Sequence, residues 1–334
     1  MNVNYLVSLV VVVALSFVPY FGIDAGLKML FGIVIPYLAF AVFFVGVINR
    51  IVSWSRSPVP FRIPTTCGQQ KSLPWFKQAK IDNPSTTVGV IARMALEIFL
   101  FRSLFRNTKM QLHKSENGPK ITFQWELWLW LAALVFHYSF FVVLTRHLRF
   151  FAEPVPFFVQ LLEKIDGIFQ VGVPGVLISG FMLLLAATYL LVRRVIIPQV
   201  KYVSLVADYF PLFLIMGIAF TGIYMRYFEK VDIVGVKALT MGIITLSPQI
   251  PAGISTIFYV HLFLVSLLVA YIPFSKLMHM GGIFMSPTRN MANNNRATRH
   301  INPWNYPVKV HSYAEYEDDF REKMIEAGLP VEKE

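Results

Sequence analysis

The chain has 334 residues, of which 56% are hydrophobic and only 15% are charged. This apolar content exceeds that of a soluble globular domain, so the sequence predicts an all-α integral membrane protein. The formal net charge of +11 does not indicate nucleic-acid binding, because most of the excess lies in loops beside apolar runs, where the positive-inside rule explains it. The single cysteine, Cys67, excludes a disulfide framework and an all-cysteine iron–sulfur cluster carried by this chain alone.

Two apolar runs open the chain, over residues 3–21 and 27–48. No Lys or Arg precedes the first run, and no small-residue cleavage site follows it, so we expect a retained span rather than a signal peptide. Residues 1–52 are therefore predicted to form two transmembrane helices.

Residues 53–122 form a long basic loop with eleven Lys or Arg residues against three acids, which marks the cytoplasmic side. Within the loop, residues 88–105 are apolar but interrupted by charges, with Arg93 and Glu97 on one helix face and Arg102 on nearly the opposite face. We expect an interfacial helix or one covered by a partner. The segment 63–80, which holds Cys67, is expected either to rest on anionic lipid or to form a subunit dock with the C-terminal tail.

Four further spans are predicted over residues 123–280, followed by a soluble cytoplasmic tail at 281–334. The spans are expected at residues 123–151, 171–192, 205–225 and 258–280. External loops are expected at 152–170 and 228–251. A total of six spans places both termini in the cytoplasm.

Four histidines lie inside apolar runs, which is costly in hydrocarbon and therefore indicates function. His137 and His147 are ten residues apart on one predicted helix, and His261 and His279 are eighteen apart on the last. Eighteen residues make five full turns, so a continuous helix would carry both imidazoles on one face, about 27 Å apart. Two imidazoles on facing helices can fill the two axial positions of a haem iron. The pattern predicts two bis-histidine haem sites.

Antiparallel helices would pair His137 with His279 near the cytoplasmic face and His147 with His261 near the outer face. A kink expected at Pro273 would absorb the unequal spacing of the two pairs. Arg146 and Arg149, which flank His147, are expected to face the propionates of the outer haem. The remaining histidines are expected to be solvent-exposed; they are His113, His300 and His311.

A second interpretation is a transporter or proton channel in which the four histidines form a relay. Asp208, a carboxylate near the start of the fifth span, could then carry a proton. Its other interpretation is an acid favoured in the first turn of a helix.

The histidine spacings resemble those of the gamma-subunit-like cytochrome b anchors of respiratory nitrate reductases. Neighbouring segments are similar as well: HLFLVSLLVAYIPFSKLMHM, LLVRRVIIPQV and IPYLAFAVFFVGVINR. The similarity covers roughly residues 33–52 and 123–280. It implies two b haems held by the four histidines and oxidation of menaquinol near the outer haem, with Lys164 as the nearest match to the family's quinol-binding lysine.

The extra first span, the basic loop and the tail with its Asn-Pro-Trp sequence depart from the nitrate reductase pattern. They look like the M subunits (DsrM) of the Dsr transmembrane complexes of sulfite and sulfate respiration, relatives of the membrane subunit of heterodisulfide reductase. This resemblance implies electron delivery to a cytoplasmic iron–sulfur subunit of the heterodisulfide-reductase type. It also implies other Dsr subunits as partners, including an extracytoplasmic cytochrome c.

Overall fold

The computed structural model confirms an all-α membrane bundle, in which six helices of the described residues are long and apolar enough to cross a bilayer. It describes residues 3–57, 59, 62–63, 68–116, 118–167, 175–296 and 310–332. The spans are α1 (Asn4–Asp24), a π-turn with α2 (Leu30–Ser55), α5 with a 3₁₀ turn (Leu127–Phe150), α7 (Ile178–Ile196), α9 with a π-turn (Val206–Glu229) and α11 with a 3₁₀ turn (Thr256–Phe274).

Two apolar clusters hold the bundle together, one in its middle and one at the end that carries residues 233–244. Helix α1 packs against α9 and α11, α5 against α7, and α11 against α2. Leu214 and Leu264 are fully buried in the first cluster, and Leu239 and Tyr259 are fully buried in the second. Because lipid tails are as apolar as these side chains, close packing rather than water exclusion favours such contacts.

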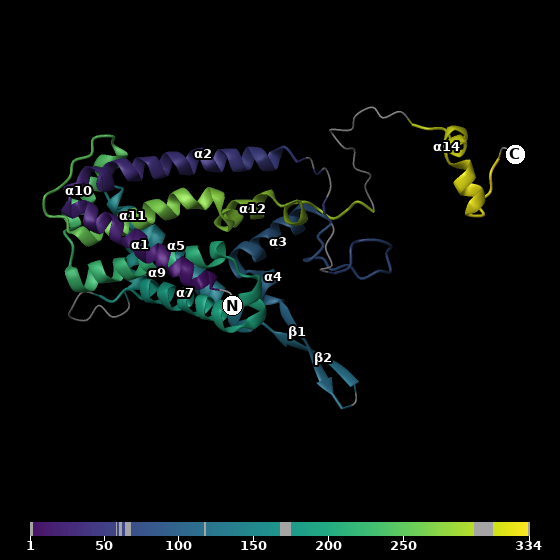
Figure 1. The fold of residues 1–334 in the computed structure, drawn as a ribbon, viewed down its shortest axis with the longest axis horizontal. Helices are drawn as coiled ribbons and strands as arrows, with labels where there is room; N and C mark the ends of the chain where they lie inside the picture. The colour runs from purple at the N-terminus through teal and green to yellow at the C-terminus, as the bar shows by residue number, and fades with distance from the viewer. Residues whose placement is uncertain are drawn as a thin grey trace.

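The two ends of the bundle carry different elements (Figure 1). Helix α10 (Ile233–Ile244) lies at one end, inside the region expected to be an external loop. The amphipathic helix α6 (Phe157–Asp166) lies within residues 152–170, the other loop expected to be external. At the other end lie α3 (Thr87–Leu100), α4 (Arg102–Phe105), α8 (Pro198–Val203) and the short α12 (His279–Met285). Figure 1 draws α14 (Tyr313–Glu326) apart from the bundle.

The predicted start of the third span at residue 123 is wrong. The strands β1 (Thr108–Ser115) and β2 (Gly118–Trp125) form an antiparallel hairpin, and the membrane helix begins only at Leu127. Alternation of apolar and polar residues in both strands, together with Gly118 at φ +99° beside the turn, favours a hairpin over a helix.

The expectation of one continuous helix from residue 258 to residue 280 is also wrong. Helix α11 ends at Tyr271, and two 3₁₀ turns flank an extended Ser275 (φ −118°, ψ 175°) before α12 begins at His279. Pro273 lacks the N–H that the next helical turn needs, so the helix stops there. Gly46 of α2 packs on this break, where an added Cβ would lie 2.6 Å from the Pro273 Cβ.

The expected interfacial helix is covered by the chain's own C-terminal segment. Helix α3 buries Val90, Arg93 and Glu97 and packs against α13 (Pro287–Asn290), which follows α12. Phe101, in the left-handed region at φ 49°, separates α3 from α4. The first part of the predicted tail therefore folds back onto the basic loop.

Candidate functional site

The structure brings the four intramembrane histidines together as the two predicted pairs. The ring centroids of His137 and His279 lie 6.0 Å apart, and those of His147 and His261 lie 6.3 Å apart. The first pair joins the middle of α5 to the start of α12, and the second joins the end of α5 to the first turns of α11. Because α5 and α11 run antiparallel, the two histidines of each pair lie at the same depth in the bundle. The helix break after Tyr271 accommodates the difference between the ten-residue spacing on α5 and the eighteen-residue spacing from His261 to His279.

These separations match what two axial ligands of one metal ion require. A ring nitrogen sits about 2 Å from a bound metal, and two such rings on opposite sides of it have centroids roughly 6 Å apart. Among the described residues, no three His, Cys, Asp or Glu side chains converge on a metal site of their own. The spacing of each pair therefore fits the two axial positions of a haem iron.

Every one of the four rings has its Nδ1 atom engaged by a hydrogen bond. His137 donates to the carbonyl of Ala133 at 2.8 Å, and His147 to that of Val143 at 2.6 Å. His279 donates to the carbonyl of Lys276 at 2.8 Å. Because a carbonyl only accepts, the hydrogen must reside on Nδ1, which leaves the lone pair of Nε2 for a metal.

The Nδ1 atom of the fourth ring, that of His261, is hydrogen-bonded by a side chain on another helix. The hydroxyl of Thr221 on α9 lies 2.8 Å from the Nδ1 atom of His261. That hydroxyl also lies 2.8 Å from the Gly217 carbonyl, to which it donates its own hydrogen, so toward His261 it accepts. The adjacent Gly222 leaves space for the ring, since a Cβ there would lie 3.3 Å from His261 Cε1.

The arginines expected at the outer haem are paired with acids of α6. Arg146 Nε lies 3.1 Å from Asp166, whose carboxylate also accepts from the Ser179 hydroxyl at 2.6 Å. Arg149 forms an ion pair with Glu163. Within the described part of the chain, the buried Nε atom of Arg226, which lies near Arg146, has no hydrogen-bond partner. An unpartnered guanidinium nitrogen close to Arg146, which adjoins His147 in the sequence, fits a carboxylate-bearing group such as a haem propionate.

The remaining residues singled out by the sequence do not bond directly to the four histidines in the described part of the chain. Lys164 is exposed on α6. Asp208 accepts from the Leu205 N–H at the start of α9 and lies 2.6 Å from Lys276 Nζ, so it acts as a first-turn acid with a lysine partner. His113 on the hairpin and His311 are exposed, as expected. Cys67 and His300 lie outside the described residues.

The inner histidine pair is bordered by the junction between α3 and α4. The ring of Phe101 lies 4.9 Å from that of His137 at an angle of 75°. The Trp130 indole donates to the carbonyl of Leu100 at 2.7 Å, and the Tyr138 hydroxyl donates to that of Phe99 at 2.9 Å. The end of α3 is thereby fixed against α5 beside His137.

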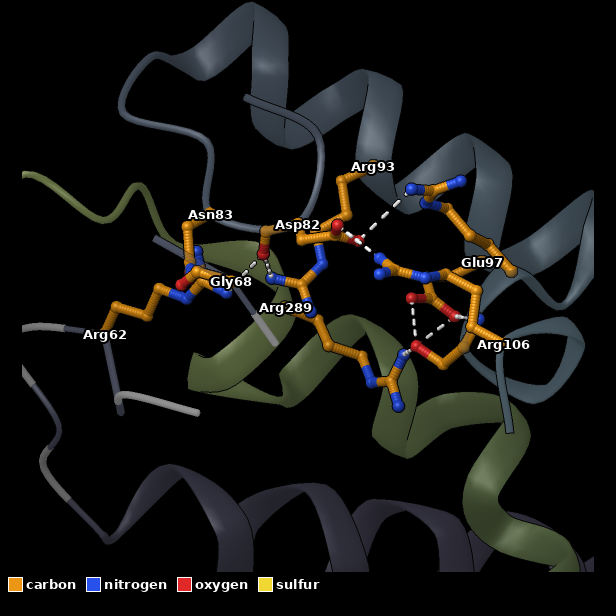
Figure 2. Close-up of polar contacts among 10 residues, drawn as sticks. Arg62, Gly68, Asp82, Asn83, Arg93, Glu97, Arg106 and Arg289 are labelled. Atoms are coloured by element: carbon orange, nitrogen blue, oxygen red, sulfur yellow. Dashed lines mark hydrogen bonds and ion pairs between the residues drawn. The ribbon is translucent and has the colours of Figure 1, made fainter. Parts of the chain in front are cut away.

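A polar cluster holds the segment after His279 against α3 (Figure 2). This inner polar cluster consists of Asp82, Arg93, Glu97, Arg106 and Arg289. Arg289 of α13 lies 3.0 Å from Glu97, and Arg93 donates to the carbonyls of Asp82 and Thr288 at 2.7 and 3.3 Å. Arg106 forms an ion pair with Asp82. Glu97 is buried, and its pair with Arg289 together with the bonds from Arg93 joins the segment after His279 to α3.

Sequence reasoning missed Thr221 and Phe101 as neighbours of the histidines. Thr221 is one polar residue in an apolar helix, 40 positions from His261. Phe101 gave only a weak signal, as an apolar residue next to Arg102 where the helix pattern becomes irregular. Neither contact follows from local spacing, since both depend on how separate helices pack.

Comparison with known proteins identifies the family of the chain. A family model described as nitrate reductase gamma subunit matches residues 87–299. A protein of Archaeoglobus fulgidus called Hdr-like menaquinol oxidoreductase cytochrome b-like subunit is 46% identical over 284 residues, which cover 83% of each chain. A protein of the same description from Archaeoglobus profundus is 42% identical over 277 residues, or 81% of each chain. The chain belongs to the nitrate reductase gamma subunit family of membrane cytochromes.

Proposed function

We propose that the chain is a dihaem cytochrome b subunit that oxidises menaquinol and passes the electrons to a cytoplasmic iron–sulfur subunit. The observation that carries this proposal is the two pairs of facing histidines, all four with Nδ1 bonded and Nε2 left for a metal. His137 and His279 would hold the inner haem, and His147 and His261 the outer one. When bound, the haems supply one-electron transfer across the bilayer.

The protein's part is to hold these ligands still and to balance charge. Backbone carbonyls and Thr221 fix the ring orientations, and hydrogen bonds of this kind also make the imidazoles better donors. Arg146, Arg149 and Arg226 supply positive charge where the outer propionates would lie. Lys164, exposed on α6 at the same end, is the proposed contact for the quinol.

The membrane orientation follows from charge. The basic loop lies at the end with α3, α4 and α12, so this end faces the cytoplasm, as do both termini. The two relatives are called Hdr-like menaquinol oxidoreductase cytochrome b-like subunits. This name supports a quinol substrate and a heterodisulfide-reductase-type partner, whereas a place in sulfite or sulfate respiration follows from the resemblance of the chain to M subunits. The other Dsr subunits, including an extracytoplasmic cytochrome c, follow from the resemblance of the chain to M subunits.

Spectroscopy of the purified chain tests the proposal. We expect a red protein with two haems per chain, a b-type spectrum after dithionite, and reduction of the haems by a soluble menaquinol analogue. A folded but colourless preparation would contradict it and would favour the histidine relay. For that relay, Asp208 would have to release its ion pair with Lys276.

A further inference from the structure

The hairpin of β1 and β2 carries an apolar face that the rest of the described chain leaves open. Cross-strand pairing places Met110 opposite Phe123 and Leu112 opposite Ile121 on this face, with Trp125 at its base. These five side chains are 66%, 69%, 69%, 54% and 48% exposed, in the order given. The strands pack mainly on each other, and Figure 1 shows the hairpin projecting beyond the bundle.

A two-stranded hairpin is marginally stable in water by itself, so its open apolar face implies that another molecule packs against it. The five side chains present on the order of 600 Å² of apolar surface, which is near the upper end for a patch on a monomer. A standard interface buries about 800 Å² on each partner. The hairpin thus offers most of one side of an interface between proteins.

The rim and the opposite face of the hairpin are basic. Lys109, Lys114 and Lys120 carry positive charge, against one acid, Glu116. A complementary partner surface is an apolar patch bordered by Asp and Glu side chains.

The base of the hairpin is joined to the inner histidine pair. Trp125 donates a hydrogen bond to the carbonyl of Phe105, and the Phe105 ring lies 4.7 Å from that of Trp125 and 4.8 Å from that of Trp130. Trp130 in turn bonds the end of α3, where Phe101 contacts His137. A protein bound to the hairpin would therefore sit beside the site from which electrons leave.

We propose that the apolar face of this hairpin docks the cytoplasmic electron-accepting subunit through an acid-rimmed apolar patch on that subunit. The inference rests on the proposed function and adds the surface at which the partner binds. A protein rather than lipid is the occupant because the hairpin extends past the end of the bundle. A lipid contact would require it to lie along the membrane surface.

The test compares two double variants of the affinity-tagged chain purified with its native subunits. Leu112→Thr with Phe123→Thr changes the apolar face and keeps residues that favour strands. Gln111→Thr with Gln124→Thr is the matched control on the opposite face. We expect the first variant to retain two haems that menaquinol analogue reduces, but to lose the iron–sulfur subunit at least tenfold. The control should retain both.

Hydrogen exchange of residues 108–125 separates a protein cover from lipid. Exchange should be fast for the chain alone in lipid nanodiscs and slow in the assembled complex. Slow exchange in nanodiscs without the partner would assign the face to lipid and overturn the proposal, as would equal retention of the subunit by both variants. Absence of haem from the unmodified chain would refute the proposed function instead, whatever the hairpin binds.

Discussion

Replacing Thr221 by valine should raise the midpoint potential of the outer haem and leave the inner haem unchanged. Valine keeps the shape of threonine but removes the oxygen that accepts from His261 Nδ1 at 2.8 Å. A weaker acceptor makes the imidazole a poorer electron donor, which disfavours the ferric state. A neutral hydrogen bond contributes about 0.5–1.5 kcal/mol. If this whole free energy stabilised only one oxidation state of the haem, the midpoint potential would shift by about 20–65 mV for a one-electron couple, which is an upper limit.

The assay is a potentiometric titration of the two haems in the purified chain, with haem content measured in parallel. Thr221→Ser keeps the hydroxyl and should titrate like the unmodified protein. Thr188→Val is the control for a membrane threonine, because the Thr188 hydroxyl donates to the Leu184 carbonyl of its own helix at 2.7 Å. A Thr221→Val protein with both haems and unchanged potentials would refute the role assigned to this hydrogen bond.

Three further predictions follow from the same geometry. His147→Ala and His261→Ala should each remove the outer haem alone, because each iron needs both axial ligands; spectra showing loss of different haems would contradict the pairing. Gly46→Val should lower stability by about 1–3 kcal/mol, because its side chain collides with Pro273; thermal unfolding in detergent, with haem release as the signal, measures this. Arg226→Gln should lower the outer midpoint potential by leaving propionate charge less compensated, and an unchanged titration would place Arg226 away from the propionates.

The sequence was sufficient for the spans and for the choice of histidine partners. A run of about twenty apolar residues can satisfy its backbone in a bilayer only as a helix, so composition alone predicts the spans. Their order makes the third and sixth spans antiparallel. This places His137 level with His279 and His147 level with His261, whatever the local geometry between them.

Other features depended on contacts between distant residues. The break after Tyr271 is stronger than the kink expected from Pro273, because Ser275 adopts an extended conformation and Gly46 of another helix packs on the gap. The hairpin at residues 108–125 was not predicted, because the apolar residues of its second strand are continuous in sequence with the apolar run of the membrane helix that follows.

The tertiary structure also decided which polar residues meet. Thr221 reaches His261 across 40 positions, and Arg289 reaches Glu97 across 192 positions, counted as 289 minus 97. Hydrogen bonds and ion pairs act over a few ångströms in space and leave no periodic trace along the chain. Periodicity and composition therefore determined where the helices and the haem-ligand candidates lie. Only the packing of the helices decided what orients each ligand.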